Sequence, residues 1–193
     1  MRRLIVIEYV SLDGVTQAPG HAQEDTAGGF AFGGWTGPFM DDHGRYMREA
    51  LNTMGALLLG RLTYDIWAGY WPTVTDPADE IARMLNAVPK YVASSTLTSG
   101  SWPQTTVITD VAGQVGELKQ QPGKAIVVMG SSQLTQSLIG HDLVDEYRLM
   151  VHPVVLGGGK RLFREGAPMQ SLRLTEAATM TTGLAILTYE PRR

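Results

Sequence analysis

The 193-residue sequence predicts an α/β domain with a mostly parallel sheet and antiparallel strands at its C-terminal end. Two observations support this fold class. As far as residue 145, short apolar runs alternate with segments of helical periodicity, as in parallel strands joined by crossover helices. After that residue, three strand-like runs follow one another with no long helix between them, which is typical of antiparallel pairing. The length suits a single domain over residues 1–193 with one core.

The apolar runs and turn signals place the individual elements. Strands are expected at Leu4–Val10, Ala56–Leu59, Tyr91–Ala93, Val107–Ile108, Ala125–Met129, Glu146–Leu156, Leu172–Met180 and Leu184–Glu190. Helices are expected from Asp41 to Met54, from Leu62 to Ala68, over Pro77–Val88 and Val111–Gln121, and after Ser132. Residues 15–38 form a long glycine-rich segment without periodicity. Because it carries Phe30, Phe32 and Trp35, we expect it to fold over a pocket rather than to be a solvated linker.

Composition excludes several classes of function. The chain has no cysteine, so disulfides, thiolate catalysis and cysteine-bound zinc are ruled out. A net charge of -3 with 18% charged residues gives no basic surface for nucleic acid. The N-terminal run MRRLIVIEYV is interrupted by Glu8 and lacks a cleavage site and the length to span a bilayer. We therefore expect it to be the first strand of a cytoplasmic protein that has no membrane partner.

The stretch Ala125–Ile139 (AIVVMGSSQLTQSLI) predicts a buried strand, a sharp turn and a helix. Gly130 allows a ligand or another backbone to approach closely, and Ser131 or Ser132 could cap the helix. The free amides and the positive dipole end of such a helix favour a bound phosphate. The same pattern is also typical of an ordinary strand-to-helix turn with a serine cap.

Three predicted strand ends share small, hydroxyl-bearing residues. They are Leu59–Thr63 (LGRLT), Ala93–Thr96 (ASST) and Met129–Ser132 (MGSS). In an open α/β sheet, ligands bind outside the carboxyl ends of the strands. Glycine amides, hydroxyls and a single arginine suit a phosphate-bearing dinucleotide better than a sugar or a metal. Arg61 could bind a 2′-phosphate with its planar guanidinium, although a surface arginine at a helix start is the simpler alternative.

Other chemistries find little support. The Gly157–Arg161 segment (GGGKR) lacks the spacing and the hydroxyl residue of a phosphate-binding loop. The four histidines show no metal-ligand spacing, and no G-x-S-x-G elbow is present, so neither a metal site nor a serine hydrolase is expected. Asp42 shares a helical face with Tyr46 and could either point inward or cap its helix. We expect most of the aromatic cluster that begins at Tyr64 to pack in the core, and one or two of its rings could contact a planar ligand.

Several segments together resemble the dihydrofolate reductase-like superfamily. They are SLDG (Ser11–Gly14), LLLGRLTYDIW (Leu57–Trp67), YVASSTL (Tyr91–Leu97), VVMGSSQL (Val127–Leu134) and HPVVLGGGKRLF (His152–Phe163). They occur in order along essentially the whole chain. Within the superfamily, the chain is similar to bacterial proteins related to the C-terminal reductase domain of the riboflavin-biosynthesis deaminase/reductase. The zinc deaminase half of that enzyme is absent from this sequence.

The resemblance implies a three-layer α/β fold, NADPH as hydride donor and a homodimer. It implies that Gly60, Arg61 and Thr63 hold the adenosine and pyrophosphate side, that Ser94 and Ser95 lie beside the adenosine phosphate, and that Gly130, Ser131, Ser132 and Leu134 cradle the pyrophosphate. Asp13 and Gly14 are expected near the nicotinamide. True dihydrofolate reductases carry an acid in the helix before the GR strand, but here Gly44 stands close to that place, with Asp42 slightly earlier.

These observations lead to an NADPH-dependent reductase of a small heterocyclic or carbonyl-type substrate. Asp13, Asp42 or an ordered water is the expected proton donor, and Trp35 and Tyr64 are expected to contact the substrate. The cofactor would supply the hydride. Dihydrofolate reductase activity and a non-catalytic small-molecule-binding dimer are the alternatives, since a fold does not fix a function.

Overall fold

The computed structural model describes residues 1–192, apart from the side chains of Asp41 and Arg45. An eight-stranded sheet runs through it in the order β4-β3-β2-β5-β1-β6-β8-β7. The strands are β1 (Leu4–Ser11), β2 (Met54–Gly60), β3 (Lys90–Ala93), β4 (Thr105–Ile108), β5 (Ala125–Met129), β6 (Glu146–His152), β7 (Leu172–Thr179) and β8 (Ala185–Pro191). Strands β1 to β6 pair in parallel, whereas β8 pairs antiparallel with both β6 and β7. The predicted mixed sheet is confirmed.

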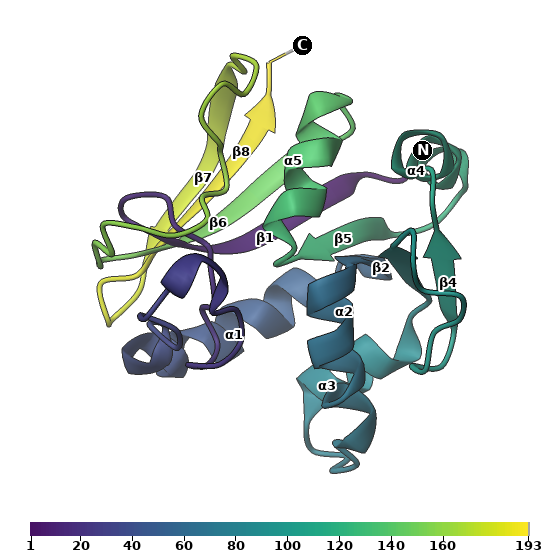
Figure 1. The fold of residues 1–193 in the computed structure, drawn as a ribbon, viewed down its shortest axis with the longest axis horizontal. Helices are drawn as coiled ribbons and strands as arrows, with labels where there is room; N and C mark the ends of the chain where they lie inside the picture. Colours follow the sequence, from purple (N-terminus) through teal and green to yellow (C-terminus); the bar gives the residue numbers. More distant parts are fainter. Residues whose placement is uncertain (193) are drawn as a thin grey trace.

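Helices cover both faces of the sheet and make three layers (Figure 1). They are α1 (Met40–Leu51), α2 (Arg61–Ala68), α3 (Glu80–Ala87), α4 (Val111–Gln120) and α5 (Ser132–Gly140), with short 3-10 turns at Ala27–Gly29, Gly37–Phe39 and Trp71–Thr73. Side chains alternate across β1, so that Ile5 and Ile7 join one core with α1 and α3. Leu4 and Val6 join the opposite core with α4 and α5.

Local chemistry moves several element boundaries from their expected places. Helix α3 begins at Glu80 rather than Pro77, because the Asp79 side chain accepts a hydrogen bond of 2.9 Å from the Ala82 amide and caps it. Strand β6 ends at His152, before Pro153, which has no amide hydrogen to donate. Strand β6 is an inner strand, since it lies between β1 and β8, and the edge strands of the sheet are β4 and β7.

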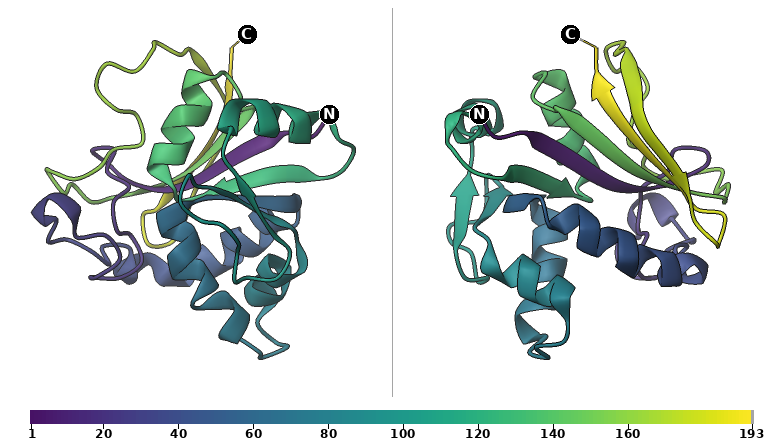
Figure 2. Two further views of the ribbon diagram at one scale, coloured as in Figure 1. Left: turned by 45° about the vertical axis from the view of Figure 1, so that its right-hand side comes forward. Right: turned by 180° about the vertical axis from the view of Figure 1, so that it is seen from behind.

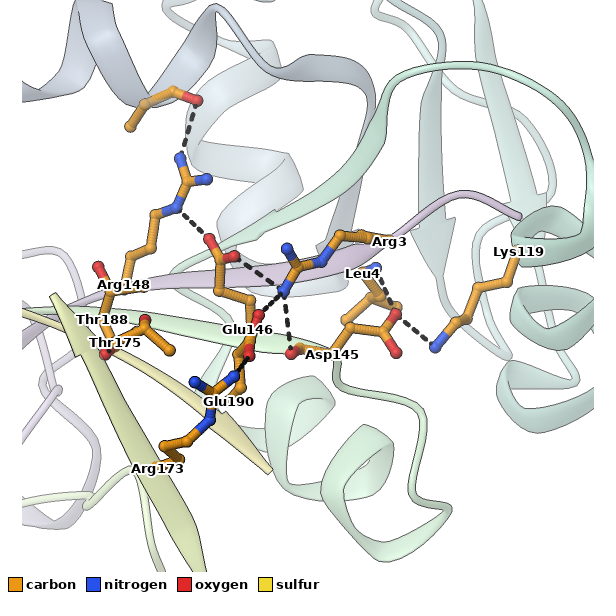
Figure 3. A network of polar contacts seen from close by, with 11 residues as sticks. Arg3, Leu4, Lys119, Asp145, Glu146, Arg148, Arg173, Thr175, Thr188 and Glu190 are labelled. Atoms are coloured by element: carbon orange, nitrogen blue, oxygen red, sulfur yellow. Dashed lines mark hydrogen bonds and ion pairs between the residues drawn. The ribbon is translucent and has the colours of Figure 1, made fainter. Parts of the chain in front are cut away.

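A network of ion pairs joins the strands at the end of the sheet where β1 and β6 begin (Figure 3). The Arg3 guanidinium lies 3.0 Å from the Glu146 carboxylate and 2.6 Å from that of Glu190. Arg173 of β7 also pairs with Glu190, at 2.5 Å. These contacts join the antiparallel strands to the start of β1, at the end of the sheet opposite the carboxyl ends of the parallel strands. The arginines are largely solvent-exposed, so each pair contributes little stability by itself.

The glycine-rich segment that follows β1 lies beside α1, at the end of the sheet where β1 ends (Figure 2). It contains little regular structure beyond two 3-10 turns. The Trp35 indole nitrogen donates a 2.9 Å hydrogen bond to the Gln17 carbonyl and fastens the segment to itself. Residues 16–20, Glu24 and Asp25 of this segment line a cavity, whereas Phe30, Phe32 and Trp35, on which the expectation of a pocket rested, are not in its lining.

Candidate functional site

A cavity of about 890 Å³ opens where four neighbouring parallel strands end. In sheet order these are β3, β2, β5 and β1. Their contributions to the lining are Ser94–Thr96 after β3, Gly60–Thr63 after β2, Gly130–Leu134 after β5 and Ile7–Tyr9 within β1. The volume is in the range of pockets for small molecules and cofactors. Nine residues expected at the cofactor meet here: Gly60, Arg61, Thr63, Ser94, Ser95, Gly130, Ser131, Ser132 and Leu134.

The N-termini of α2 and α5 both face this cavity, and neither is capped by a side chain. Ser131 occupies the cap position of α5 with a φ of 63°, but it makes no capping hydrogen bond. Its hydroxyl instead donates to Thr63 Oγ1 at 2.8 Å and accepts from the Gly60 amide at 2.9 Å. The Ser132 hydroxyl shares a 2.8 Å hydrogen bond with Thr16. The expected serine cap is therefore wrong, and both first turns keep amides to offer an anion.

Arg61 lies at the start of α2, beside the turn that follows β3. Its Nε contacts both carboxylate oxygens of Asp65, at 2.8 and 2.7 Å, and its Nη1 lies 3.4 Å from Thr96 Oγ1. The Ser94 hydroxyl accepts the Leu97 amide at 3.0 Å and shapes that turn. The guanidinium is partly exposed, so it can exchange Asp65 for an incoming phosphate.

These donors fit the dinucleotide phosphates that the sequence predicts. Two uncapped helix N-termini supply backbone amides and positive dipole ends. The hydroxyls of Thr63, Ser131 and Ser132 stand at the same helix starts. Gly130, with a φ of 59°, turns the chain between β5 and α5 without a β-carbon in the way. The residues present therefore match a pyrophosphate.

Glu8 of β1 is the buried carboxyl of this cavity, and sequence reasoning missed it. Its side chain lines the cavity and the residue is only 3% exposed. The Thr135 hydroxyl donates to Glu8 Oε1 at 3.4 Å. Burial raises the pKa of Glu8 to about 8, with the Thr135 hydrogen bond opposing the shift. At neutral pH this carboxyl is therefore mostly protonated. The one signal in the sequence is an acid within an otherwise apolar strand.

Asp13 and Gly14 lie outside the cavity lining. The Asp13 carboxylate accepts from the Ser11 hydroxyl at 2.7 Å and from the amides of Leu156 and Gly157 at 3.1 and 2.9 Å. These contacts, led by the Ser11 hydroxyl, lower the pKa of Asp13 to about 2. Arg161 donates to the Asp13 carbonyl beside Gly14. Asp13 therefore ties two turns together as a carboxylate and holds no proton to donate.

Asp42, Trp35 and Tyr64 also lie outside the lining. The buried Asp42 carboxylate accepts hydrogen bonds from Thr181 and Thr182, in the turn between β7 and β8. Tyr64 is 2% exposed, and its hydroxyl accepts from the Trp102 amide at 3.0 Å. All three are enclosed by other elements, so the two aromatic rings expected to contact substrate and the acid expected to donate a proton contact protein groups in this structure.

A buried histidine pair was also missed from the sequence. Nε2 of His43 in α1 lies 2.8 Å from Nε2 of His152 in β6. His152 Nδ1 faces the Val10 carbonyl at 3.3 Å and must donate to it, so its Nε2 accepts the proton of His43 Nε2. Burial, followed by the neighbouring His152, lowers the pKa of His43 to about 4, so the ring is neutral. Residues 109 positions apart carry no shared signal in the sequence.

His43 borders an apolar half of the cavity, between α1, α2 and α3. This half of the cavity is lined by the apolar side chains of Met40, Met47, Leu51, Ile66, Trp67, Trp71, Ile81 and Leu85. Tyr9 stacks on the His43 ring with a centroid distance of 4.7 Å. Gly44 lines the same half and offers no side chain to a ligand. Two tryptophans and the Tyr9–His43 stack suit a planar ring.

The described residues contain no cluster of three or more histidines and acids placed to hold a metal ion. Over residues 1–192, no helix is both long enough and apolar enough to cross a bilayer.

Comparison with known proteins agrees with the fold and the motifs. The RibD C-terminal domain family matches residues 2–186. Two relatives are the uncharacterised proteins YyaP and YwjB of Bacillus subtilis strain 168. YyaP is 33% identical over 143 residues, which cover 73% of this chain and 76% of that protein. YwjB is 28% identical over 174 residues, which cover 90% of this chain and 89% of that protein.

Two solved structures share the fold at low sequence identity. A putative riboflavin biosynthesis protein from Shewanella sp. PV-4 superposes with a TM-score of 0.66 at 20% identity, over 99% of each chain. A pyrimidine reductase-like protein from Corynebacterium diphtheriae gives a TM-score of 0.60 at 13% identity, over 100% of this chain and 92% of its own. The expected dihydrofolate reductase-like α/β architecture is confirmed. Because the family model matches almost the whole length of this chain, the chain belongs to the RibD C-terminal domain family.

Proposed function

We propose that this protein is an NADPH-dependent reductase that transfers a hydride to a small heterocyclic or carbonyl-type substrate. The observation that carries the proposal is the convergence of two uncapped helix N-termini on one cavity. Membership of the RibD C-terminal domain family supports a reductase. One structural neighbour, a pyrimidine reductase-like protein, supports the same reaction class.

The strand order gives the cofactor an orientation. The adenosine end lies after β3, beside Ser94, Ser95 and Arg61, and the pyrophosphate lies between the starts of α2 and α5. Neighbouring strands are about 4.8 Å apart, so the three steps from β3 to β1 span about 14 Å. That is comparable with the span of an extended dinucleotide. The nicotinamide end then reaches β1, where Glu8 and Tyr9 line the cavity.

The apolar half of the cavity is the proposed substrate site. When bound, the cofactor supplies the hydride, and the chain supplies orientation and exclusion of water. Trp67, Trp71 and Met47 wall the site, and the neutral His43 borders it. Folate reduction is less well supported, because Gly44 stands where the resemblance implies a pterin-binding acid.

Titration with NADPH and NADH, followed by tryptophan fluorescence, tests the cofactor. Trp67 and Trp71 line the cavity, so a bound reduced nicotinamide should quench their emission. A screen of heterocyclic and carbonyl compounds for loss of reduced nicotinamide absorbance then tests turnover. Binding of NADPH with turnover of at least one class is the expected result. Failure of both cofactors to bind would refute the proposal and favour a small-molecule-binding protein without turnover.

We also propose a homodimer. Val155 is 67% exposed and Phe163 is 46% exposed, and they lie in the segment between β6 and β7. The exposed edge strand β7 lies beyond them along the chain and offers a row of unpaired backbone groups. Apolar groups near an open edge are typical of a contact surface.

A further inference from the structure

We propose that Glu8 is a proton-exchanging residue at the nicotinamide end of the cavity, protonated beside the reduced cofactor and ionised beside the oxidised one. This inference rests on the proposed function, because it needs a nicotinamide dinucleotide in the cavity. The two expected proton donors, Asp13 and Asp42, differ from Glu8 in that their contacts tie them to turns outside the lining.

The place of Glu8 follows from where two neighbouring strands stop. Strand β5 ends at Met129, which pairs with Ile7, whereas β1 continues to Ser11. Glu8 is therefore the first residue of β1 beyond the end of β5, and it borders the crevice that opens there. Alternation along β1 puts its side chain on the face covered by α5, and the contact with Thr135 confirms this.

Among the residues that the structure describes, none brings a positive charge to the Glu8 carboxyl. Helix α5 (SQLTQSLIG) contributes only the Thr135 hydroxyl, and the residue beside Glu8 on β6 is Leu149. The lining cations among the described residues are Arg61 and Lys160, and they pair with Asp65 and Asp25 at 2.7 and 2.5 Å. Of the other lining acids, Glu24 accepts the Gly20 amide at the rim.

A buried carboxyl in such a place keeps its proton until a cation comes near. Oxidation turns the uncharged reduced ring into a cation, and that change occurs at the end of the cavity where Glu8 lies. Burial already raises the pKa of Glu8 to about 8, so the carboxyl starts with the proton. A nearby positive charge favours the carboxylate and lowers that pKa again.

The reaction balances with Glu8 in this role. The substrate gains a hydride at carbon from the cofactor and a proton at nitrogen or oxygen from solvent, so its C=N or C=O double bond becomes single. The proton comes from solvent because the substrate site against α1, α2 and α3 lies on the face of β1 opposite to the Glu8 carboxyl. Glu8 gives its own proton to solvent when the ring becomes a cation. The Glu8 O–H bond breaks, and its electron pair stays on the carboxylate. Glu8 then recovers a proton from solvent after the oxidised cofactor leaves.

Proton release during cofactor binding tests the inference without a substrate. Isothermal titration calorimetry with NADP⁺ and with NADPH, in two buffers of different ionisation enthalpy at pH 7, counts the protons released. The wild type should release about one proton with NADP⁺ and none with NADPH. Glu8→Gln should bind both cofactors and release none. Glu117→Gln, a control at an exposed acid of α4 outside the cavity lining, should behave as wild type.

Equal proton release by the wild type and Glu8→Gln would overturn the inference, and so would no release by the wild type. If neither cofactor binds, the proposed function fails and this inference fails with it. If Glu8→Gln does not fold, the carboxyl resonance of ¹³C-glutamate-labelled wild type decides. It should show Glu8 ionising on addition of NADP⁺, and an unchanged resonance refutes the role.

Discussion

Replacing Glu8 by glutamine should change how the stability of the protein depends on pH. Folding raises the pKa of this carboxyl from 4.5 to about 8. The unfolded chain therefore loses the proton first as the pH rises. The stability that the protonated carboxyl provides is complete below pH 4.5 and is lost progressively as the pH rises through 8. By pH 7 the loss is on the order of 3 kcal/mol, at 1.36 kcal/mol per pH unit of difference.

The neutral glutamine cannot ionise in either state, and its amide oxygen can still accept the Thr135 hydroxyl. Glu8→Gln should therefore match the wild type near pH 5 and exceed it increasingly up to pH 8. Urea denaturation at pH 5, 6, 7 and 8, followed by tryptophan fluorescence and circular dichroism, gives the free energy of unfolding of each protein. The control Glu117→Gln, at an exposed acid of α4, should not reproduce the gain.

A Glu8→Gln protein that loses the same stability at every pH would refute this reasoning. It would mean that Glu8 stays ionised in the folded protein and has a partner for its charge. A gain that stops growing above pH 8 is expected, because both states of the wild type then carry the carboxylate and the difference no longer depends on pH.

Four further results are expected. Arg61→Ala should remove most of the preference for NADPH over NADH, a loss on the order of 1.5–3 kcal/mol measured by fluorescence titration; equal wild-type affinities would exclude the 2′-phosphate contact. Asparagine tolerates the φ of 59° at position 130 better than a β-branched residue would, so the Gly130→Asn protein should fold but bind NADPH much more weakly. Normal NADPH binding by this variant would place the pyrophosphate elsewhere. Between pH 7 and pH 4, His43 should cost the wild type on the order of 3 kcal/mol of unfolding free energy, and His43→Gln should remove this loss. The pKa of His43 is about 4 in the folded protein, so the unfolded chain binds a proton first as the pH falls below 6.5. Urea midpoints that are the same for wild type and His43→Gln at both pH 7 and pH 4 would contradict this. Light scattering at micromolar concentration should give a dimer that Val155→Asp with Phe163→Asp disrupts, and a monomeric wild type would rule the dimer out.

The sequence alone determined the framework of the fold and the strand ends that line the cavity. Apolar periodicity located all eight strands and five helices within a few residues. The Gly-Arg, Ser-Ser and Gly-Ser-Ser strand ends predicted a common ligand edge, because the carboxyl ends of parallel strands meet at one edge whatever the strand order. Pattern reasoning succeeds here since it depends only on local spacing and on a rule of topology.

Only the tertiary structure decided which acid and which aromatic residues face the cavity. Asp13 and Glu8 lie five positions apart, yet the pKa of the first falls to about 2 and that of the second rises to about 8. The difference comes from Ser11, Leu156 and Gly157 around one carboxyl, and from burial against α5 around the other.

The tertiary structure also decided which residues far apart in the sequence meet. His43 and His152 meet because α1 packs on the sheet beside β6. Tyr64 is enclosed, with its hydroxyl hydrogen-bonded to the amide of Trp102. Desolvation and contacts between distant segments set these pKa values and orientations. Neither is encoded in the local pattern of apolar and polar residues, so only the assembled fold determines them.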